Sequence, residues 1–141
     1  MRLALDSAIF IYALSSTPEW SARAQALLEH IHAGRAQAVA STLCLTEVLI
    51  KPYGLSDSAG LAAQLFMEGL EHLDYIPVDT EIAIRAATLR GHYGSVLKLA
   101  DAIHLAAALE HRADAFITND HALAKLKIEG LTVTLLANWS A

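Results

Sequence analysis

The chain has 141 residues, of which 55% are hydrophobic and 18% are charged, and its formal net charge is −5. No uncharged apolar run reaches the roughly 18 residues that span a bilayer, and Asp6 interrupts the apolar N-terminal stretch before a signal-peptide core could form. Composition therefore excludes a membrane-spanning segment and predicts a soluble, cytoplasmic protein without a membrane partner. A chain of this length is expected to fold as one domain over residues 1–141.

Charge and cysteine content narrow the classes further. Acidic residues number 15 against 10 Lys and Arg, and no basic tract or Arg-rich arm occurs, so sequence-independent binding of long nucleic acid should be weak. The single cysteine, Cys44, cannot form an internal disulfide, which agrees with a reducing compartment.

Short apolar runs of strand length alternate with helical patterns along the chain. The predicted strands are residues 2–5, 36–40, 75–78, 115–118 and 131–136. Strands that alternate with helices are typical of an α/β fold, here a three-layer α/β/α sandwich with a mainly parallel central sheet of about five strands and right-handed crossovers.

Three stripes of apolar residues at helical spacing lie between these strands. The first begins after Thr17 and Pro18, which are expected to cap the helix and to occupy its first position. Turn signals at 51–54 and 91–95 are expected to break the later helical stretches. The stripes are Trp20, Ala24, Leu27, Leu28 and Ile31; Leu61, Leu65, Phe66, Leu70 and Leu73; and Ile82, Ala86, Leu89 and Tyr93.

Four acidic residues stand where a soluble fold would place apolar or neutral ones. Asp6 and Asp120 directly follow predicted strands, whereas Glu47 and Asp101 interrupt apolar helical segments. Embedded carboxylates are protonated, ion-paired or bound to a metal, because an unpaired buried charge is costly. Both strand ends lie at the same edge of a parallel sheet, where such folds bind ligands. If the two helices begin at that edge, the four acids meet in one pocket and offer the oxygen ligands that hard divalent cations prefer.

Four separate motifs together resemble a known family. They are residues 6–12 (DSAIFIY), 41–48 (STLCLTEV), 100–106 (ADAIHLA) and 116–120 (FITND). Their order and spacing resemble those of PIN-domain nucleases, especially the small VapC-type toxins of bacterial toxin–antitoxin pairs. The resemblance runs essentially end to end and implies a single PIN domain over 1–141. Ser7 stands where family members commonly have Thr, and the hydroxyl is retained.

The resemblance implies a metal-dependent endoribonuclease. By this likeness Asp6, Glu47 and Asp101 are the main ligands of Mg²⁺ or Mn²⁺, directly or through water, and Asp120 completes the catalytic and metal-binding set. Thr118 would support the site by hydrogen bonding. Carboxylate-held ions of this kind shield the phosphate and lower the pKa of bound water.

The resemblance also implies partners. RNA is the expected substrate, and a homodimer and a cognate antitoxin are the expected protein partners, the antitoxin placing a basic side chain in the acidic pocket. The segment 43–73 carries more apolar residues than one small core absorbs, which is typical of an interface. Lys98 and Arg90 flank the loop before Asp101 and are candidates for contacting substrate phosphates, with solvated charge as the alternative.

Each assignment has an alternative. Asp6 and Asp120 could simply cap the helices that follow them, and Glu47 could be a solvated helical residue. His104 is expected to be a hydrogen-bonded structural histidine, although it could donate to a carboxylate. Cys44 is expected to be a small buried hydrophobe and not a nucleophile.

Two other functions compete with the nuclease. A catalytically silent PIN-fold module that binds RNA or protein would be expected to have lost one of the four acids, and all four are present. A phosphotransferase or phosphatase of the haloacid-dehalogenase type needs a second Asp two positions after the first, where this chain has Ala8.

Overall fold

The computed structural model describes residues 1–141 and contains five β-strands, seven α-helices and two short 3₁₀ helices. None of the helices combines the length and the apolar character needed to cross a membrane. In chain order the elements are β1 (Arg2–Leu5), α1 (Ser7–Leu14), α2 (Trp20–His32), β2 (Gln37–Ser41), α3 (Leu43–Leu55), α4 (Asp57–Glu68), β3 (Leu73–Ile76), α5 (Thr80–Tyr93), η1 (Gly94–Val96), α6 (Leu99–Glu110), β4 (Ala115–Thr118), α7 (His121–Ala124), β5 (Thr132–Leu135) and η2 (Leu136–Asn138).

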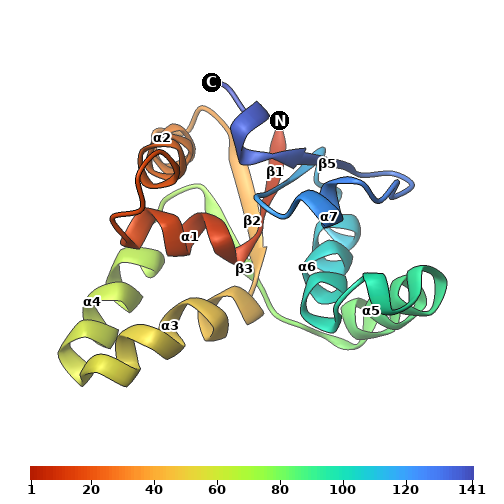
Figure 1. The fold of residues 1–141 in the computed structure, drawn as a ribbon, viewed down its shortest axis with the longest axis horizontal. Helices are drawn as coiled ribbons and strands as arrows, with labels where there is room; N and C mark the ends of the chain where they lie inside the picture. Colours follow the sequence, from red (N-terminus) through yellow and green to blue (C-terminus); the bar gives the residue numbers. More distant parts are fainter.

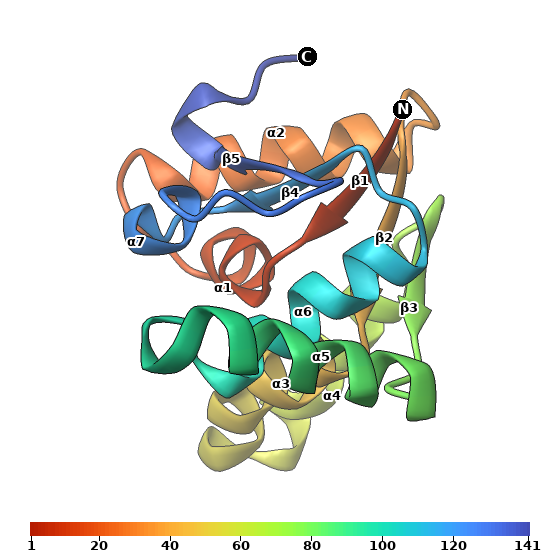
Figure 2. The same ribbon diagram turned by 90° about the vertical axis from the view of Figure 1, so that its right-hand side faces the viewer.

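The five strands form one parallel sheet in the order β3-β2-β1-β4-β5. All carboxyl ends therefore point to one edge. The chain first builds outward from β1 to β3 and then continues from the other side of β1 with β4, so the strand order reverses between β1 and β4. In open α/β sheets, ligands bind in the crevice at this reversal. Figure 2 shows β1 and β4 side by side, with α1 following β1.

Helices cover both faces of the sheet (Figure 1): α1 to α4 lie on one side, and α5 and α6 lie on the other. Because side chains alternate along a strand, Leu3 and Leu5 enter the core beneath α1 to α4, while Ala4 enters the core beneath α5 and α6. Strand β4 divides in the same way, with Ile117 in the first core and Phe116 in the second. The predicted three-layer sandwich is confirmed.

Two strands were predicted to the residue, two are shifted by one or two residues, and β5 is one residue shorter at each end than predicted. Strands β1 and β4 match their predicted ranges, whereas β2, β3 and β5 occupy 37–41, 73–76 and 132–135. The largest displacement is in β3, where the predicted range 75–78 included Pro77. Proline has no amide proton to donate to a sheet, and β3 ends at Ile76, one residue before it.

The predicted capping of the first long helix is wrong. Helix α2 begins at Trp20, its N-terminal flanking residue is Glu19, and no side chain caps it. The hydroxyl of Ser21 holds the connection instead: it accepts from the Thr17 amide at 2.8 Å and donates to the Ser15 carbonyl at 2.9 Å. Thr17 and Pro18 therefore belong to the loop.

The turn signal at 51–54 does not break the chain where predicted. Helix α3 runs through Pro52 and Gly54 to Leu55, and Pro52 merely removes the one internal hydrogen bond that its amide would have made. The break comes at Ser56, whose hydroxyl caps α4. The later signal is half correct, since Gly91 lies within α5 but Gly94, at φ 71°, ends that helix.

Helix α4 buries two small residues and one large one, and it exposes its other large apolar side chains. Its buried positions are Gly60, Ala63 and Met67. A side chain at Gly60 would overlap the ring of Tyr53, so glycine allows α3 and α4 to approach closely. The predicted helical stripe is correct for Leu61, Leu65 and Phe66 and wrong for Leu70 and Leu73, which lie beyond the helix. The large apolar residues of the stripe that lie on the helix are exposed, namely Leu61 (50%), Leu65 (59%) and Phe66 (38%).

Candidate active site

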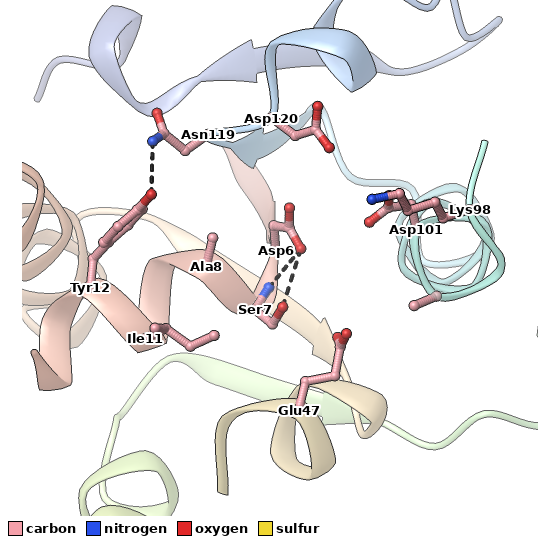
Figure 3. Close-up of a pocket in the computed structure, with 11 residues that line it drawn as sticks. Asp6, Ser7, Ala8, Ile11, Tyr12, Glu47, Lys98, Asp101, Asn119 and Asp120 are labelled. Carbon is pink, nitrogen blue, oxygen red and sulfur yellow. Dashed lines mark hydrogen bonds between the residues drawn. The ribbon is translucent and has the colours of Figure 1, made fainter. Parts of the chain in front are cut away.

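A pocket of about 470 Å³ opens at the carboxyl edge of the sheet, beside the ends of β1 and β4. All four acidic residues predicted from the sequence line it: Asp6, Glu47, Asp101 and Asp120 (Figure 3). They come from the loop after β1, from α3, from α6 and from the loop after β4. Segments far apart in the chain thus bring four carboxylates to one cavity.

Asp6 is fixed from both sides and is 7% exposed. Its Oδ1 accepts from the Ser7 amide at 2.8 Å and thereby caps α1, while its Oδ2 accepts from the Thr118 hydroxyl at 2.7 Å. Its own amide donates to the Ile117 carbonyl, which extends the pairing of β1 with β4. Asp6 is therefore both a helix cap and a pocket residue, so the two readings of this aspartate are compatible.

Asp120 also combines these two positions. Its Oδ1 accepts from the amides of Ala122 and Leu123 at 2.9 and 3.1 Å, which caps α7. Only Oδ1 takes part in these bonds, so Oδ2 is left for a ligand. The Asp120 amide donates to the hydroxyl of Thr118 at 3.1 Å. Thr118, with no exposed surface, therefore joins Asp6 and Asp120 through one hydroxyl group.

Glu47 projects from α3 into the pocket while a buried histidine holds its carboxylate. Nε2 of His104 lies 2.5 Å from Oε1 of Glu47, and the Glu47 side chain is 33% exposed. On the other side of the ring, Nδ1 of His104 lies 2.9 Å from the Ser41 hydroxyl. His104 is buried and hydrogen-bonded, as expected, and its contact with Glu47 also matches the alternative that the sequence left open, donation to a carboxylate.

The pKa of Asp101 reflects the other charges of the acidic pocket. It lies in the first turn of α6 and is half-buried. The pKa of Asp101 is raised to about 6, mainly by burial and next by the neighbouring charge of Asp6; His104 opposes this shift, while Asp120 and Glu47 add to it. The four acids therefore interact, although they lie far apart in the sequence.

The negative charge of the pocket is poorly balanced within the protein. None of the ion pairs in the chain includes Asp6, Asp101 or Asp120. Lys98 is the only basic residue that lines the pocket. Carboxylates clustered without cationic partners favour a bound cation.

The donor set fits a hard divalent ion bound partly through water. No group of three or more His, Cys, Asp or Glu side chains converges closely enough to form a ready metal site. Mg²⁺ is usually held by one or two carboxylates and keeps several waters, so it does not require such a convergence. Oxygen donors in a pocket of this size match that mode of binding, and the residues that could hold such an ion, directly or through water, are Asp6, Glu47, Asp101 and Asp120.

The structure places the remaining candidates differently from one another. Lys98 lines the pocket, whereas Arg90 lies on α5, outside the lining. Cys44 has no exposed surface, and burial raises the pKa of its thiol well above the ordinary value, with Asp6 and Glu47 raising it further. The thiol therefore stays protonated, in agreement with the expected buried hydrophobe.

Tyr12 and Asn119 are polar residues of the pocket that were not among the predicted site residues. Asn119 donates to the Tyr12 hydroxyl at 3.0 Å, and both side chains line the cavity (Figure 3). Asn119 lies in the motif 116–120 (FITND) and Tyr12 ends the motif 6–12 (DSAIFIY), so both stand inside segments that carry the family resemblance. Their mutual hydrogen bond has no sequence signal, because it depends on the packing of α1 against β4.

Fold and site together define an α/β protein with an acidic pocket at the strand-order reversal of a parallel sheet. Residues 3–129 match the PIN domain family model, and the chain belongs to the PIN domain family. No curated protein matches the sequence.

Several solved structures share the fold. A toxin–antitoxin complex from Klebsiella pneumoniae is 26% identical, with 92% of this chain and 95% of that chain covered and a TM-score of 0.66. VapBC2 from Rickettsia felis, bound to a promoter DNA fragment, is 17% identical, with 96% and 98% covered and a TM-score of 0.70. DNA-bound VapBC from Salmonella typhimurium is 18% identical, with 96% and 98% covered and a TM-score of 0.70.

Proposed function

We propose that this protein is a divalent-metal-dependent endoribonuclease that hydrolyses RNA phosphodiester bonds in the cytoplasm, as the VapC-type toxin of a toxin–antitoxin pair. In this proposal residues 1–141 act as a single PIN domain. The observation that carries it is the convergence of four carboxylates in one pocket in which the three aspartates have no ion-pair partner. Membership of the PIN domain family supports it.

Each acid has a distinct part in the proposed reaction. A bound Mg²⁺ or Mn²⁺ supplies charge neutralisation of the phosphate and activation of water. The two direct ligands are Asp6, which Ser7 and Thr118 hold in place, and Asp101, which lies in the first turn of α6. Glu47 and Asp120 keep free oxygens on the pocket, where they orient water and complete the ion's surroundings.

Substrate contacts follow from the rim of the pocket. Lys98, an exposed cation beside Asp101, is positioned to pair with a phosphate next to the one that is cleaved. Arg90 stays a weaker prediction, because it lies outside the lining. An acidic pocket repels RNA until cations are bound, so binding as well as cleavage should depend on the divalent ion.

An antitoxin site is proposed in the neighbouring apolar groove. This groove has a volume of about 620 Å³, lies between α1, α3 and α4, and shares Ile11 and Glu47 with the acidic pocket. A peptide lying there could therefore place a basic side chain among the carboxylates. The likeness to solved toxin–antitoxin complexes supports an antitoxin as the partner.

A homodimer is proposed through the outer face of α4. The exposed apolar side chains Leu61, Leu65 and Phe66 are too large and too numerous for an ordinary solvated helix face. Size-exclusion chromatography with light scattering should show a dimer at micromolar concentration, and a strict monomer would remove this part of the proposal.

RNA cleavage by purified wild-type protein, with and without EDTA, tests the proposed activity. Cleavage should require Mg²⁺ or Mn²⁺, and Asp101→Asn should reduce its rate by at least about 100-fold, the order of loss for one essential electrostatic group. Asp74→Asn is the matched control, because Asp74 is exposed on β3 and away from the pocket. Equal rates for wild type and Asp101→Asn would contradict the catalytic assignment. Ion-independent RNA binding without cleavage by the wild type would indicate the silent binding module instead.

A further inference from the structure

One buried titratable group adjoins the pocket without lining it. His104 is 2% exposed and lies on α6, one turn after Asp101. Both ring nitrogens have partners, Glu47 at Nε2 and Ser41 at Nδ1. Those partners come from α3 and from the last residue of β2, so the ring links three elements behind the acidic pocket.

The hydrogen bonds of His104 with Glu47 and Ser41 fix the orientation of the imidazole ring. An ionised carboxylate can only accept, so Nε2 of His104 carries the proton donated to Glu47. Nδ1 is then satisfied by the Ser41 hydroxyl, which is 1% exposed and can serve as donor or acceptor. The Cys44 thiol lies 3.8 Å from the same nitrogen and closes that side of the ring. The imidazole is thus held in one orientation by buried groups.

Glu47 needs such a support more than the other acids do. Asp6 and Asp120 have short side chains fixed by backbone amides. Glu47 has a longer, more flexible side chain that is one-third exposed, and its hydrogen-bond partner is His104 alone. Since only Oε1 meets the histidine, Oε2 remains free to face the pocket, where Figure 3 shows Glu47 rising from α3 towards Asp6.

We propose that His104 is a positioning residue: clamped by Ser41, it holds the Glu47 carboxylate in the orientation that a divalent ion or its water requires. This inference rests on the proposed function, because it assumes that a divalent ion binds in the pocket. Groups that hydrogen-bond to metal-ligating side chains typically change metal affinity or activity by 10–100-fold when they are removed.

Two substitutions separate this role from simple packing. The amide nitrogen of Gln reaches roughly the place of Nε2, whereas that of Asn reaches only the place of Nδ1. His104→Gln therefore keeps a donor for Glu47, and His104→Asn keeps only the Ser41 side. Both remove an aromatic ring from the same buried site, so a purely structural histidine would make the two variants equivalent.

Isothermal titration of the metal-free protein with Mn²⁺, in the absence of RNA, measures the effect directly. We expect His104→Asn to weaken Mn²⁺ binding by about 10–100-fold and His104→Gln by no more than about 3-fold. In a Glu47→Gln background, His104→Asn should weaken binding no further, because the coupling runs through Glu47. Circular dichroism and thermal unfolding verify that each variant is folded.

Several outcomes would overturn the inference. Mn²⁺ affinity at the wild-type level in folded His104→Asn, equal losses in the Gln and Asn variants, or an undiminished loss in the Glu47→Gln background would each do so. If His104→Asn fails to fold, Ser41→Ala tests the same clamp, with a loss of about 3–10-fold expected and unchanged affinity contradicting it. Absence of Mn²⁺ binding by the wild type at millimolar concentration would instead overturn the metal-dependent function, and the inference with it.

Discussion

The acidic pocket and the apolar groove beside it share Glu47 and Ile11, yet they are built in opposite ways. In the pocket, polar groups are buried and held by hydrogen bonds, as in the pairing of Asp6 with Thr118. In the groove and on the outer face of α4, large apolar groups such as Leu55 (76% exposed) and Leu65 face solvent.

This difference teaches how one small domain can carry two surfaces. The pocket depends on fixed polar geometry, so its contacts are local and sensitive to single atoms. The groove depends on exposed apolar area. Small residues on the buried face of α4 pack against α3, and this packing leaves large apolar side chains of α4 exposed. Substitutions in the pocket should therefore affect chemistry, and those in the groove should affect association.

The largest effect on stability is expected on α4, where one large residue anchors the helix. Met67 has no exposed surface, and Met67→Ala should lower the free energy of unfolding by about 2–5 kcal/mol. Leu65→Ala, at a position 59% exposed on the same helix, should change it by less than about 0.5 kcal/mol. Urea unfolding measures both, and similar losses for the two variants would contradict the assigned orientation of α4.

Removing the hydroxyl that joins two of the acids should have the next largest effect. Thr118→Val keeps the shape of the side chain but leaves Asp6 Oδ2 and the Asp120 amide without their partner. We expect a loss of about 1–3 kcal/mol in the free energy of unfolding and a larger proportional loss in RNA cleavage. Thr132→Val is the control, because Thr132 is exposed on β5. Full cleavage by the Thr118 variant would show that Thr118 is not needed to support the site.

A change in the groove should spare cleavage and weaken association. Leu55→Gln creates no cavity, because Leu55 is already 76% exposed. The free energy of unfolding should therefore change by less than about 0.5 kcal/mol. Antitoxin affinity should fall by about 10-fold, the cost of losing one buried leucine contact. Ile84→Gln, on α5 across the sheet, is the matched control. Unchanged affinity, measured by calorimetry with the co-purifying antitoxin, would move the partner site elsewhere.

The smallest effect is expected for Asp101→Asn, which should raise the free energy of unfolding at neutral pH but not at acidic pH. The pKa of Asp101 rises from 3.8 to about 6 on folding, so in the metal-free protein ionised Asp101 opposes folding progressively from about pH 4 to pH 6 and constantly above. Asp101→Asn should then be more stable than wild type by about 1 kcal/mol at pH 7, after allowing for solvent screening of a half-exposed group, and about equal at pH 4. Urea unfolding in EDTA checks this, with Asp74→Asn as control. A less stable Asp101→Asn variant at pH 7 would contradict the repulsion among the acids.

Local patterns in the chain were sufficient for the number and order of the strands, for the layers and for singling out the four acids. Alternating short apolar runs and helical stripes are properties of neighbouring residues, so β1 and β4 could be located to the residue. The same patterns placed Asp6 and Asp120 after strands, and the acids that interrupt apolar segments at Glu47 and Asp101 marked positions that only a special environment tolerates.

Local patterns were misleading where packing decides between equivalent options. Both faces of α4 carry apolar residues, and the stripe of large ones was predicted to continue as a helix to Leu73, whereas α4 ends at Glu68. The close approach of α3 across Gly60 buries the face that carries Gly60, Ala63 and Met67. Pro52 likewise looked like a break, yet α3 continues through it and packs against α4.

The amino-acid sequence by itself determined the α/β architecture and the identity of the four acids, because strand and helix periodicity and buried charge are legible over a few residues. Only the tertiary structure decided how the acids are held. His104, which orients Glu47, lies 57 positions after Glu47 in the chain, and Ser41, which holds the His104 ring, lies 63 positions before His104. These contacts therefore depend on how the sheet and helices pack. Hydrogen bonds between distant segments leave no local periodicity, and three-dimensional packing alone brings such partners together.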